Sequence, residues 1–350
     1  MERTLTTLTL MISLAGTSHS QIKDILWTIG PNIPEFRKGG CAVALGGKII
    51  SVFGMRQPWG EMDTMYIYDP QRGWWSRGPN APVGQAYVQG TVCQGAFYAI
   101  GGRMRGVRNH CYRLEDKGNE NYQWTQMPHL NQAKAWAPSV TIGSKVYVLG
   151  GSVGGHGPTS NAVEMMDTSD SHPQWKMLST IPGKSRGWSG AAAVNGKIYL
   201  IGGNHFSSLK PKRSNDRKRL SEVLVYNTET GNWTNKTPLP YLLAGMDCVA
   251  YENRYIIVVG GAALVSSYSE ELKELHRNVR GHEYYYCPFV LVYDTETDHW
   301  KRLPSLLPVP TNDIRIVLLD KKLYALGGEN IERATSNTTP WFRIGHIIVE

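Results

Sequence analysis

The sequence predicts an all-β fold in which six four-stranded blades form a closed propeller. Three observations lead to this prediction. A short apolar phrase ending in glycine recurs six times, a Tyr and a Trp follow five of its copies, and the two chain ends carry complementary parts of the sixth. Repeats of about 50 residues indicate one supersecondary unit per repeat, stacked on its neighbours.

The first phrase is a run of β-branched and aromatic residues closed by Gly-Gly, or by Gly-Met in its first copy. Such a run, bounded by turn residues, predicts a buried strand. Measured at the first glycine, the steps between copies are 47, 49, 52, 58 and 67 residues. The six copies are GKIISVFGM (47–55), GAFYAIGG (95–102), GSKVYVLGG (143–151), GKIYLIGG (196–203), RYIIVVGG (254–261) and KKLYALGG (321–328).

A second phrase lies downstream of these glycines and places a Tyr seven residues before a Trp. Two short strands joined by a polar turn explain this spacing. A proline-rich linker then leads to the next copy. Clear copies of the second phrase are YDPQRGWW (68–75), YNTETGNW (226–233) and YDTETDHW (293–300), and looser copies end at Trp124 and Trp175.

The sixth repeat is split between the two ends of the chain. After the last Gly-Gly pair the chain holds one more strand-like segment, WFRIGHIIVE, and no Trp strand follows it. The N-terminal segment ILWTIGPNIP (25–34) closely matches WWSRGPNAP (74–82), which is a Trp strand with its linker. We therefore expect the N-terminal strand to complete the last blade, which removes a sheet edge that would otherwise pair with other chains.

Together these phrases resemble the kelch repeat over about residues 23–350. The resemblance implies blades of four strands, a to d from the centre outwards, in which b ends at Gly-Gly, c carries the Tyr and d carries the Trp. It also implies that the b–c and d–a loops share one rim of the propeller. Because these are the long and varied loops in this chain, we expect the functional site on that rim.

The first 20 residues have the layout of an export signal, with an early Arg, an apolar stretch over 5–15 and small residues near position 20. We expect residues 1–20 to be a signal peptide, residues 21–350 to be the propeller, and the protein to be periplasmic or secreted. No later stretch is long and apolar enough to span a membrane. The five cysteines include no C-x-x-C pair and the ten histidines are scattered, so we expect buried thiols and no metal site.

Two insertions interrupt the repeats. Residues 206–221 hold six cations and one acid in a chain of formal net charge +8, but they lack interleaved aromatic residues and any base-reading motif. We therefore expect a solvated loop there and no nucleic-acid partner. Residues 264–283 carry a Ser cap, early acids, late cations and a Gly stop. This pattern predicts a short helix, either a lid over the channel or a packing cap.

Seven residues on the predicted rim are candidates for the site. Glu329 is the only acid that directly follows one of the repeated Gly-Gly pairs, since the others precede Arg, Ser, Asn or Ala. A cationic rim around an isolated carboxylate suits an acidic small molecule that needs a proton moved, because Arg grips a carboxylate through two parallel hydrogen bonds. The alternative is that these arginines are solvated loop charges or pair with the acids. The catalytic candidates are Glu329 and Arg333, and the ligand-binding candidates are Arg56, Arg103, Arg186, His205 and Asp313.

The sequence lacks the residues that several other reactions require. Copper radical oxidases also use kelch propellers, but the tempting run YYYC at 284–287 has no accompanying pair of His ligands. A serine hydrolase is not supported, because no G-x-S-x-G motif is present. We expect no cofactor.

Within the kelch proteins, the chain resembles exported bacterial sialic acid mutarotases (N-acetylneuraminate epimerases). The shared features are the export signal, a long b–c insertion ending in an aromatic run, here GHEYYYCPFVLVYD, and a following b strand that ends in Gly-Glu. The resemblance implies that Glu329 accepts a proton and that an Arg six residues on assists it. Thr335 holds that position here, and Arg333 is the nearest Arg. The resemblance also implies circular permutation, since that family places these two blades mid-chain.

We therefore expect a mutarotase that acts on an acidic sugar such as N-acetylneuraminate through proton transfer at the anomeric centre. A single carboxylate can serve this reaction if water or a second group returns the proton. The alternative is a non-catalytic exported kelch module that binds a glycan or a protein on the same rim.

Overall fold

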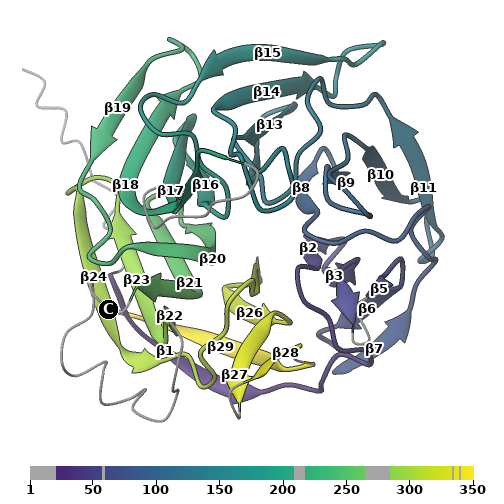
Figure 1. Cartoon of the computed structure of the whole chain (residues 1–350). Helices are drawn as coiled ribbons and strands as arrows, with labels where there is room; N and C mark the ends of the chain where they lie inside the picture. The colour runs from purple at the N-terminus through teal and green to yellow at the C-terminus, as the bar shows by residue number, and fades with distance from the viewer. Residues whose placement is uncertain (1–20, 57–59, 209–216, 265–283, 333–334, 339) are drawn as a thin grey trace, which may run out of the picture.

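The computed structural model describes residues 21–350 apart from 57–59, 209–216, 265–283, 333–334 and 339. Its strands form six sheets arranged as a ring (Figure 1). No helix occurs in the part of the chain that the structure describes, and therefore no long apolar helix there crosses a membrane. The predicted signal peptide, residue 333 and all but the first residue of the predicted 264–283 helix lie outside the described residues.

Blades 1 to 3 follow one another along the chain, and each is a four-stranded antiparallel sheet. Their strands, in order from the channel outwards, are as follows. Blade 1 has β2 (Cys41–Leu45), β3 (Lys48–Val52), β6 (Met65–Asp69) and β7 (Trp74–Arg77), with the hairpin β4 (Met55–Arg56) and β5 (Gly60–Glu61) in its b–c loop. Blade 2 has β8 (Gln89–Cys93), β9 (Ala96–Ile100), β10 (Cys111–Asp116) and β11 (Tyr122–Met127). Blade 3 has β12 (Ser139–Ile142), β13 (Lys145–Leu149), β14 (Ala162–Asp167) and β15 (Trp175–Thr180).

Blades 4 to 6 complete the ring. Blade 4 has β16 (Gly190–Val194), β17 (Lys197–Phe206), β18 (Arg217–Asn227) and β19 (Trp233–Lys236). Blade 5 has β20 (Leu243–Tyr251), β21 (Tyr255–Leu264), β23 (Phe289–Asp294) and β24 (His299–Leu306), and β22 (Tyr284–Tyr286) also pairs with β21. Blade 6 has β25 (Arg315–Leu319), β26 (Lys322–Leu326), β29 (Phe342–Val349) and β1 (Ile22–Ile29), with the hairpin β27 (Glu329–Glu332) and β28 (Thr335–Thr338) in its b–c loop.

The last blade is closed by the N-terminal strand, which confirms the prediction. Strand β1 lies antiparallel to β29, with Ile25 opposite Ile347 and Trp27 opposite Gly345 (Figure 1). Gly345 allows this approach, because a Cβ there would lie 2.6 Å from the Ile25 side chain. The two ends of the chain are therefore joined by a sheet ladder.

The repeated Gly-Gly pair lets one blade contact the next. In blade 3, Gly150 has a φ of 61°, and a Cβ there would lie 2.3 Å from the carbonyl oxygen of Arg186 in the linker to blade 4. The amide of Gly151 donates to that same carbonyl at 2.8 Å. In blade 2, Gly102 donates in the same way to Lys134 at 2.8 Å. The Gly-Gly signature thus serves contact between blades.

The repeated Trp residues also form hydrogen bonds with the proline-rich linkers. The indole N–H of Trp75 in blade 1 donates to the carbonyl of Pro31, which follows β1 of blade 6, at 2.8 Å. Trp175 of blade 3 donates to Pro128 in the linker that leaves blade 2, at 3.0 Å. Trp75 and Trp175 thus each fix the linker of the preceding blade, which explains why these two sequence signals occur together.

The basic insertion is not wholly a loop, contrary to the prediction. Strand β17 runs on to Phe206 and β18 begins at Arg217, and these two residues are paired. Leu220 in this extension is buried, so the ladder also buries apolar surface. The middle of the insertion, 209–216, lies outside the described residues. The five cysteines are free and buried, as predicted.

Candidate functional site

One residue of each blade adopts a left-handed backbone conformation near the start of the innermost strand, with φ between 52° and 74°. Four of the six are not glycine, and three are bulky aromatic residues, for which this conformation is uncommon. It costs a non-glycine residue about 1–2 kcal/mol. We call these six residues the inner ring: Gly39, Tyr87, Trp136, Trp188, Gly245 and Asp313.

Backbone hydrogen bonds link the inner ring in blade order. The amide of Tyr87 donates to the carbonyl of Gly39 at 2.6 Å, and the amide of Asp313 donates to Gly245 at 2.9 Å. The three bonds between these ends measure 3.3, 3.0 and 2.8 Å. These interblade bonds explain how bulky residues are held in a costly conformation, because strain of this kind persists where surrounding structure enforces it.

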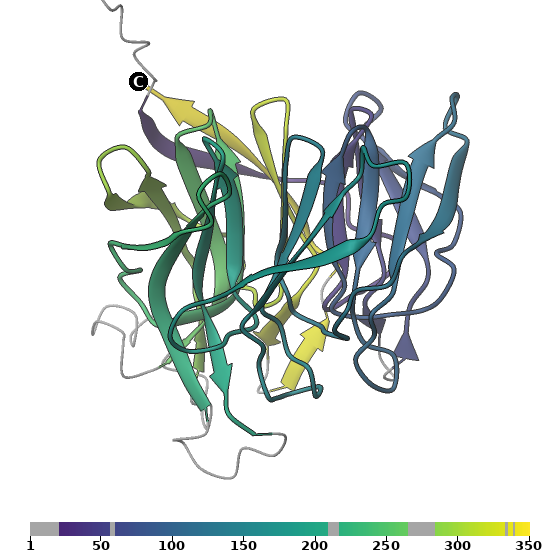
Figure 2. The same cartoon turned by 90° about the horizontal axis from the view of Figure 1, so that it is seen from above.

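The inner ring lies between two cavities. The rim cavity, about 280 Å³, is bounded by the b–c and d–a loops, and the channel cavity, about 430 Å³, runs along the innermost strands. Trp136, Trp188, Gly245 and Asp313 line both. In the view from above, the yellow β27–β28 hairpin of the loop-bearing rim lies at the opposite side from the C-terminus (Figure 2). Loops of both predicted kinds thus meet around one cavity.

One side of the rim cavity is an aromatic wall, formed by Tyr87, Trp136 and Trp188 of blades 2, 3 and 4. The rings of Tyr87 and Trp136 are stacked with centroids 4.1 Å apart, and those of Trp136 and Trp188 are stacked at 4.3 Å. Phe206 meets the edge of Trp188 at 5.2 Å. Blades 5, 6 and 1 place Gly245, Asp313 and Gly39 at the equivalent positions, so that half of the inner ring carries no aromatic residue.

The non-aromatic side holds Glu329, whose side chain is 8% exposed. Its carboxylate contacts the ammonium of Lys38 and accepts a hydrogen bond from the side-chain amide of Asn312 at 2.9 Å. Glu329 and Asn312 also exchange two backbone hydrogen bonds, of 2.8 and 2.9 Å. Glu329 is therefore held from both its backbone and its side chain, and it lines the rim cavity.

Asp313 is the second carboxyl group of the rim cavity. Burial raises the pKa of Asp313 to about 6, and the nearby charge of Glu329 acts in the same direction. Burial lowers the pKa of Lys38, but Glu329, Tyr87 and Asp313 act in the opposite direction and together raise the pKa above its ordinary value. Asp313 thus titrates at mildly acidic pH, and it lies in the same cavity as Glu329, which is paired with the ammonium of Lys38.

The rim cavity brings together two of the seven predicted residues, Glu329 and Asp313. Arg56, Arg103, Arg186 and His205 lie outside its lining. Arg186 is buried within blade 4, where it donates to the carbonyl of Gly202 at 3.4 Å and lies 3.8 Å from Glu222. The Arg186 guanidinium therefore lies against Gly202 and Glu222 and not in the lining of the rim cavity.

The other predicted residues have separate surroundings. The side chain of Arg56 is 60% exposed and lies 3.4 Å from Glu35. The His205 ring lies 2.9 Å from the carbonyl oxygen of Ser185. Arg103 is bridged through its backbone to Ala86. The second catalytic candidate, Arg333, is outside the described residues.

The seven predicted candidates did not include the aromatic wall, Lys38 or Arg219, which all line the rim cavity. A signal for the wall was present. Tyr87, Trp136 and Trp188 recur at 49 and 52 residues, which matches the steps of the glycine phrase. No such spacing links Lys38 with Glu329, because they lie near opposite ends of the chain.

The comparisons with known proteins agree with this architecture. A family model described as the KLHDC2/KLHL20/DRC7 Kelch-repeats domain matches residues 87–328, more than half of the chain. The chain belongs to the kelch-repeat family. The repeated Gly-Gly, Tyr and Trp positions are therefore kelch positions, and the aromatic wall and Glu329 are side chains carried on that scaffold.

Curated relatives are about a quarter identical to the chain over the aligned residues. Kelch-like protein 15 of Danio rerio is 24% identical over 280 residues, which are 75% of this chain and 42% of the relative. Alpha-scruin of Limulus polyphemus is 25% identical over 272 residues, which are 76% of this chain and 27% of the relative. The chain thus spans less than half the length of each.

Among solved structures, that of YjhT superposes with a TM-score of 0.67 at 18% identity, covering 89% of this chain and 95% of YjhT. At this identity the match shows a shared fold. The circular permutation expected from the mutarotase resemblance stays a prediction.

Proposed function

We propose that this kelch propeller is a mutarotase that interconverts the anomers of an acidic sugar such as N-acetylneuraminate in the rim cavity. The observation that carries the proposal is the pair of carboxyl groups, Glu329 and Asp313, in different surroundings. Glu329 is bonded to Lys38 and Asn312, whereas burial raises the pKa of Asp313 to about 6. Two neighbouring carboxyl groups in different environments can take the acid and the base role of one reaction.

The two groups match the two proton transfers of ring opening. The carboxylate of Glu329 takes the proton from the anomeric hydroxyl, and the carboxylic acid of Asp313 gives a proton to the ring oxygen. The ring C–O bond breaks as the carbonyl forms. When the ring closes on the other face of that carbonyl, both transfers reverse. The free sugar and the two carboxyl groups then return to their starting protonation states.

The remaining lining suits an anionic sugar. The aromatic wall offers flat apolar surface to one face of the sugar ring. Lys38 and Arg219 line the same cavity and supply positive charge for the sugar carboxylate. Arg219 donates through Nη1 to the carbonyl of Ala262, and its guanidinium carries five N–H donors, so it can serve the protein and a ligand together.

Anomer exchange of N-acetylneuraminate, followed by exchange NMR, tests the proposal. The wild type is expected to accelerate exchange, and Glu329→Gln or Asp313→Asn is expected to lose about 10²–10⁴-fold in rate. Glu229→Gln is the matched control, because Glu229 is exposed and distant from the cavity lining. No acceleration by the wild type would overturn the proposal. Acceleration that survives Glu329→Gln would leave the activity but remove Glu329 from it.

A second candidate is a non-catalytic exported module that binds a glycan or a protein segment in the same cavity. The ion pair of Lys38 and Glu329 favours it, because this pair joins blades 1 and 6 and so has a structural purpose without catalysis. Under this alternative, a ligand binds to the aromatic wall and Trp188→Ala abolishes binding. Glu329→Gln then leaves the ligand affinity nearly unchanged, and anomer exchange stays at the uncatalysed rate.

A further inference from the structure

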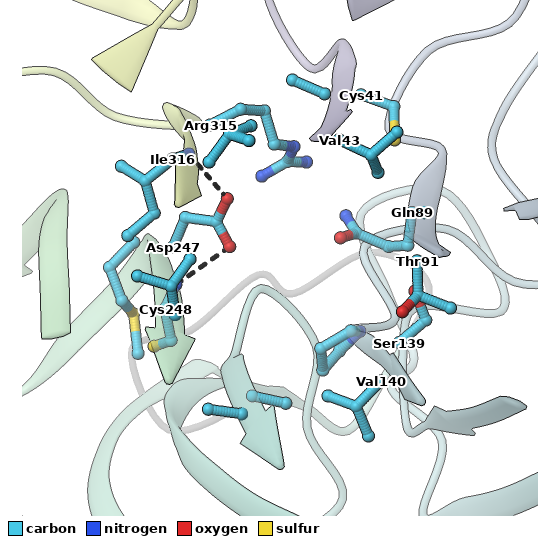
Figure 3. A pocket seen from close by; sticks show the side chains of 18 of the residues that line it. Cys41, Val43, Gln89, Thr91, Ser139, Val140, Asp247, Cys248, Arg315 and Ile316 are labelled. Atoms are coloured by element: carbon cyan, nitrogen blue, oxygen red, sulfur yellow. Dashed lines mark hydrogen bonds between the residues drawn. The ribbon is translucent and has the colours of Figure 1, made fainter. Parts of the chain in front are cut away.

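The channel cavity lies on the other side of the inner ring from the proposed sugar site, and it has a polar cluster of its own (Figure 3). Gln89, Ser139, Asp247 and Arg315 contribute to this cluster from the innermost strands of blades 2, 3, 5 and 6. None of them takes part in the proposed mutarotation. The cavity volume of about 430 Å³ is in the range of small-molecule sites.

Asp247 supplies a carboxylate to this cavity. Its Oδ1 accepts a hydrogen bond from the amide of Cys248 at 2.9 Å, and its Oδ2 accepts one from the amide of Ile316 at 3.0 Å. Each carboxylate oxygen can accept a second bond, and the carboxylate points into the cavity (Figure 3). Burial raises the pKa of Asp247, whereas the charge of Arg315 and the two backbone hydrogen bonds act in the opposite direction.

Arg315 supplies the opposite charge. Its Nε donates to the carbonyl of Gly40 at 2.8 Å, and its Nη1 donates to the carbonyl of Ile314 at 3.1 Å. The guanidinium, which has five N–H donors, extends toward the cavity centre between Asp247 and Gln89 (Figure 3). The hydrogen bonds described for Asp247 and Arg315 go to backbone groups and not to each other, so the two charges border a gap in the described structure.

We propose that the channel cavity binds a zwitterionic α-amino acid with a small side chain, whose ammonium bonds Asp247 and whose carboxylate bonds Arg315. A ligand with one charge would be attracted by one of these groups and repelled by the other. A zwitterion meets both. Ala44, Ala193 and Val249 line the cavity further along the strands and leave small apolar surface for the side chain.

Saturation-transfer NMR on the full chain tests this site with three probes that share the alanine side chain and differ in charge. L-alanine carries both charges, N-acetyl-L-alanine lacks the ammonium, and L-alanine methyl ester lacks the carboxylate. We expect transfer to L-alanine and at least about tenfold weaker binding of both derivatives, the usual loss when a charge-assisted hydrogen bond is removed. No transfer to L-alanine, or equal transfer to all three probes, would overturn the proposal.

A variant that fills the cavity separates the site from fold stability. Ala191 lines the channel cavity, so Ala191→Leu adds bulk there without changing any charge. L-alanine binding is expected to be lost, while the unfolding temperature and the anomer exchange in the rim cavity are retained. Undiminished L-alanine binding by Ala191→Leu would place the ligand elsewhere and overturn the assignment. Asp247→Asn is expected to weaken L-alanine binding by at least about tenfold. It should also reduce the difference in affinity between L-alanine and N-acetyl-L-alanine.

Discussion

The ammonium of Lys38 contacts the carboxylate of Glu329 at the point where the propeller closes, joining residues 291 positions apart. Lys38 lies in the loop that leads into blade 1, and Glu329 begins the b–c loop of blade 6. Their side chains are 17% and 8% exposed, so solvent screens the pair only weakly. The ring is therefore closed twice, by this ion pair near the channel and by the β1–β29 ladder at the outer edge.

The first prediction concerns the stability of this ion pair. Removing one partner of a buried pair leaves an uncompensated charge and costs about 3–5 kcal/mol. We expect Lys38→Met and Glu329→Gln each to destabilise the fold, and the double variant to cost less than the sum by more than about 1 kcal/mol. Urea unfolding of all four proteins measures this coupling. Additive single effects would show that the contact contributes nothing to stability.

The second prediction concerns stability against pH. Burial and Glu329 raise the pKa of Asp313 from 3.8 to about 6, so the folded protein holds this proton more tightly than the unfolded chain does. The contribution of Asp313 to stability is therefore greatest at or below pH 3.8 and falls as pH rises to about 6. In thermal unfolding, the Tm of Asp313→Asn should rise relative to that of the wild type between pH 3.8 and about 6, because only the wild type loses this contribution. Parallel curves for the two proteins would contradict the raised pKa.

The third prediction concerns the pH dependence of anomer exchange. If protonated Asp313 donates to the ring oxygen, the wild-type rate should fall as pH rises above about 6, because the acid form is then lost. The measurement is exchange NMR at several pH values, with the uncatalysed rate subtracted at each. Asp313→Asn should lose both the rate and this descending limb. A residual rate in that variant with an unchanged limb would assign the pH dependence to another group.

The fourth prediction compares two glycines with nearly the same backbone conformation. Gly150 has a φ of 61° and Gly143 a φ of 60°, but a Cβ on Gly150 would lie 2.3 Å from the Arg186 oxygen, whereas no atom lies within 4 Å of one on Gly143. Both alanine variants bear the same left-handed strain. Gly150→Ala should cost about 1–3 kcal/mol more in chemical denaturation, because it forces blades 3 and 4 apart. Equal costs would mean that the Gly-Gly signature serves φ alone.

The fifth prediction tests the N-terminal strand with adjacent residues on its two faces. Ile25 is fully buried and Leu26 is 61% exposed. Ile25→Asp buries an unpaired charge and should detach β1 or unfold the protein, whereas Leu26→Asp should change stability by less than about 0.5 kcal/mol. Size-exclusion chromatography should also reveal self-association of Ile25→Asp, because β29 becomes an open edge. A monomeric, fully stable Ile25→Asp would show that β1 is dispensable.

Much of the architecture could be predicted because each kelch signal acts locally or between adjacent repeats. Gly150 and Gly151 meet the next linker, and Trp75 holds the preceding one, so the same requirement recurs in blade after blade. The split last blade was predictable for the same reason, since the missing Trp strand had a recognisable copy at the other end of the chain. The prediction of a loop at 206–221 was partly wrong, because residues 217–221 pair with β17 despite their polar composition.

The site was less predictable, because its residues are defined by which side chains the ring brings together. Charge and position placed Arg186 among the ligand-binding candidates, yet its guanidinium is buried against Gly202 and Glu222. The aromatic wall recurs at the blade spacing, but a repeated Trp in a linker is equally consistent with a core position. Only the left-handed inner ring turns Tyr87, Trp136 and Trp188 toward one another.

By itself, the sequence determined the repeat, the number of blades, the closure by the N-terminal strand and the exceptional position of Glu329 after Gly328. These properties depend on short motifs whose physical requirements repeat along the chain. Only the tertiary structure decided that Lys38 and Asn312 hold Glu329 and that burial and the charge of Glu329 raise the pKa of Asp313. It also decided that Asp247 and Arg315 line a second cavity. Closing a ring brings residues from different blades together around one axis, and no local pattern in the chain encodes those distances.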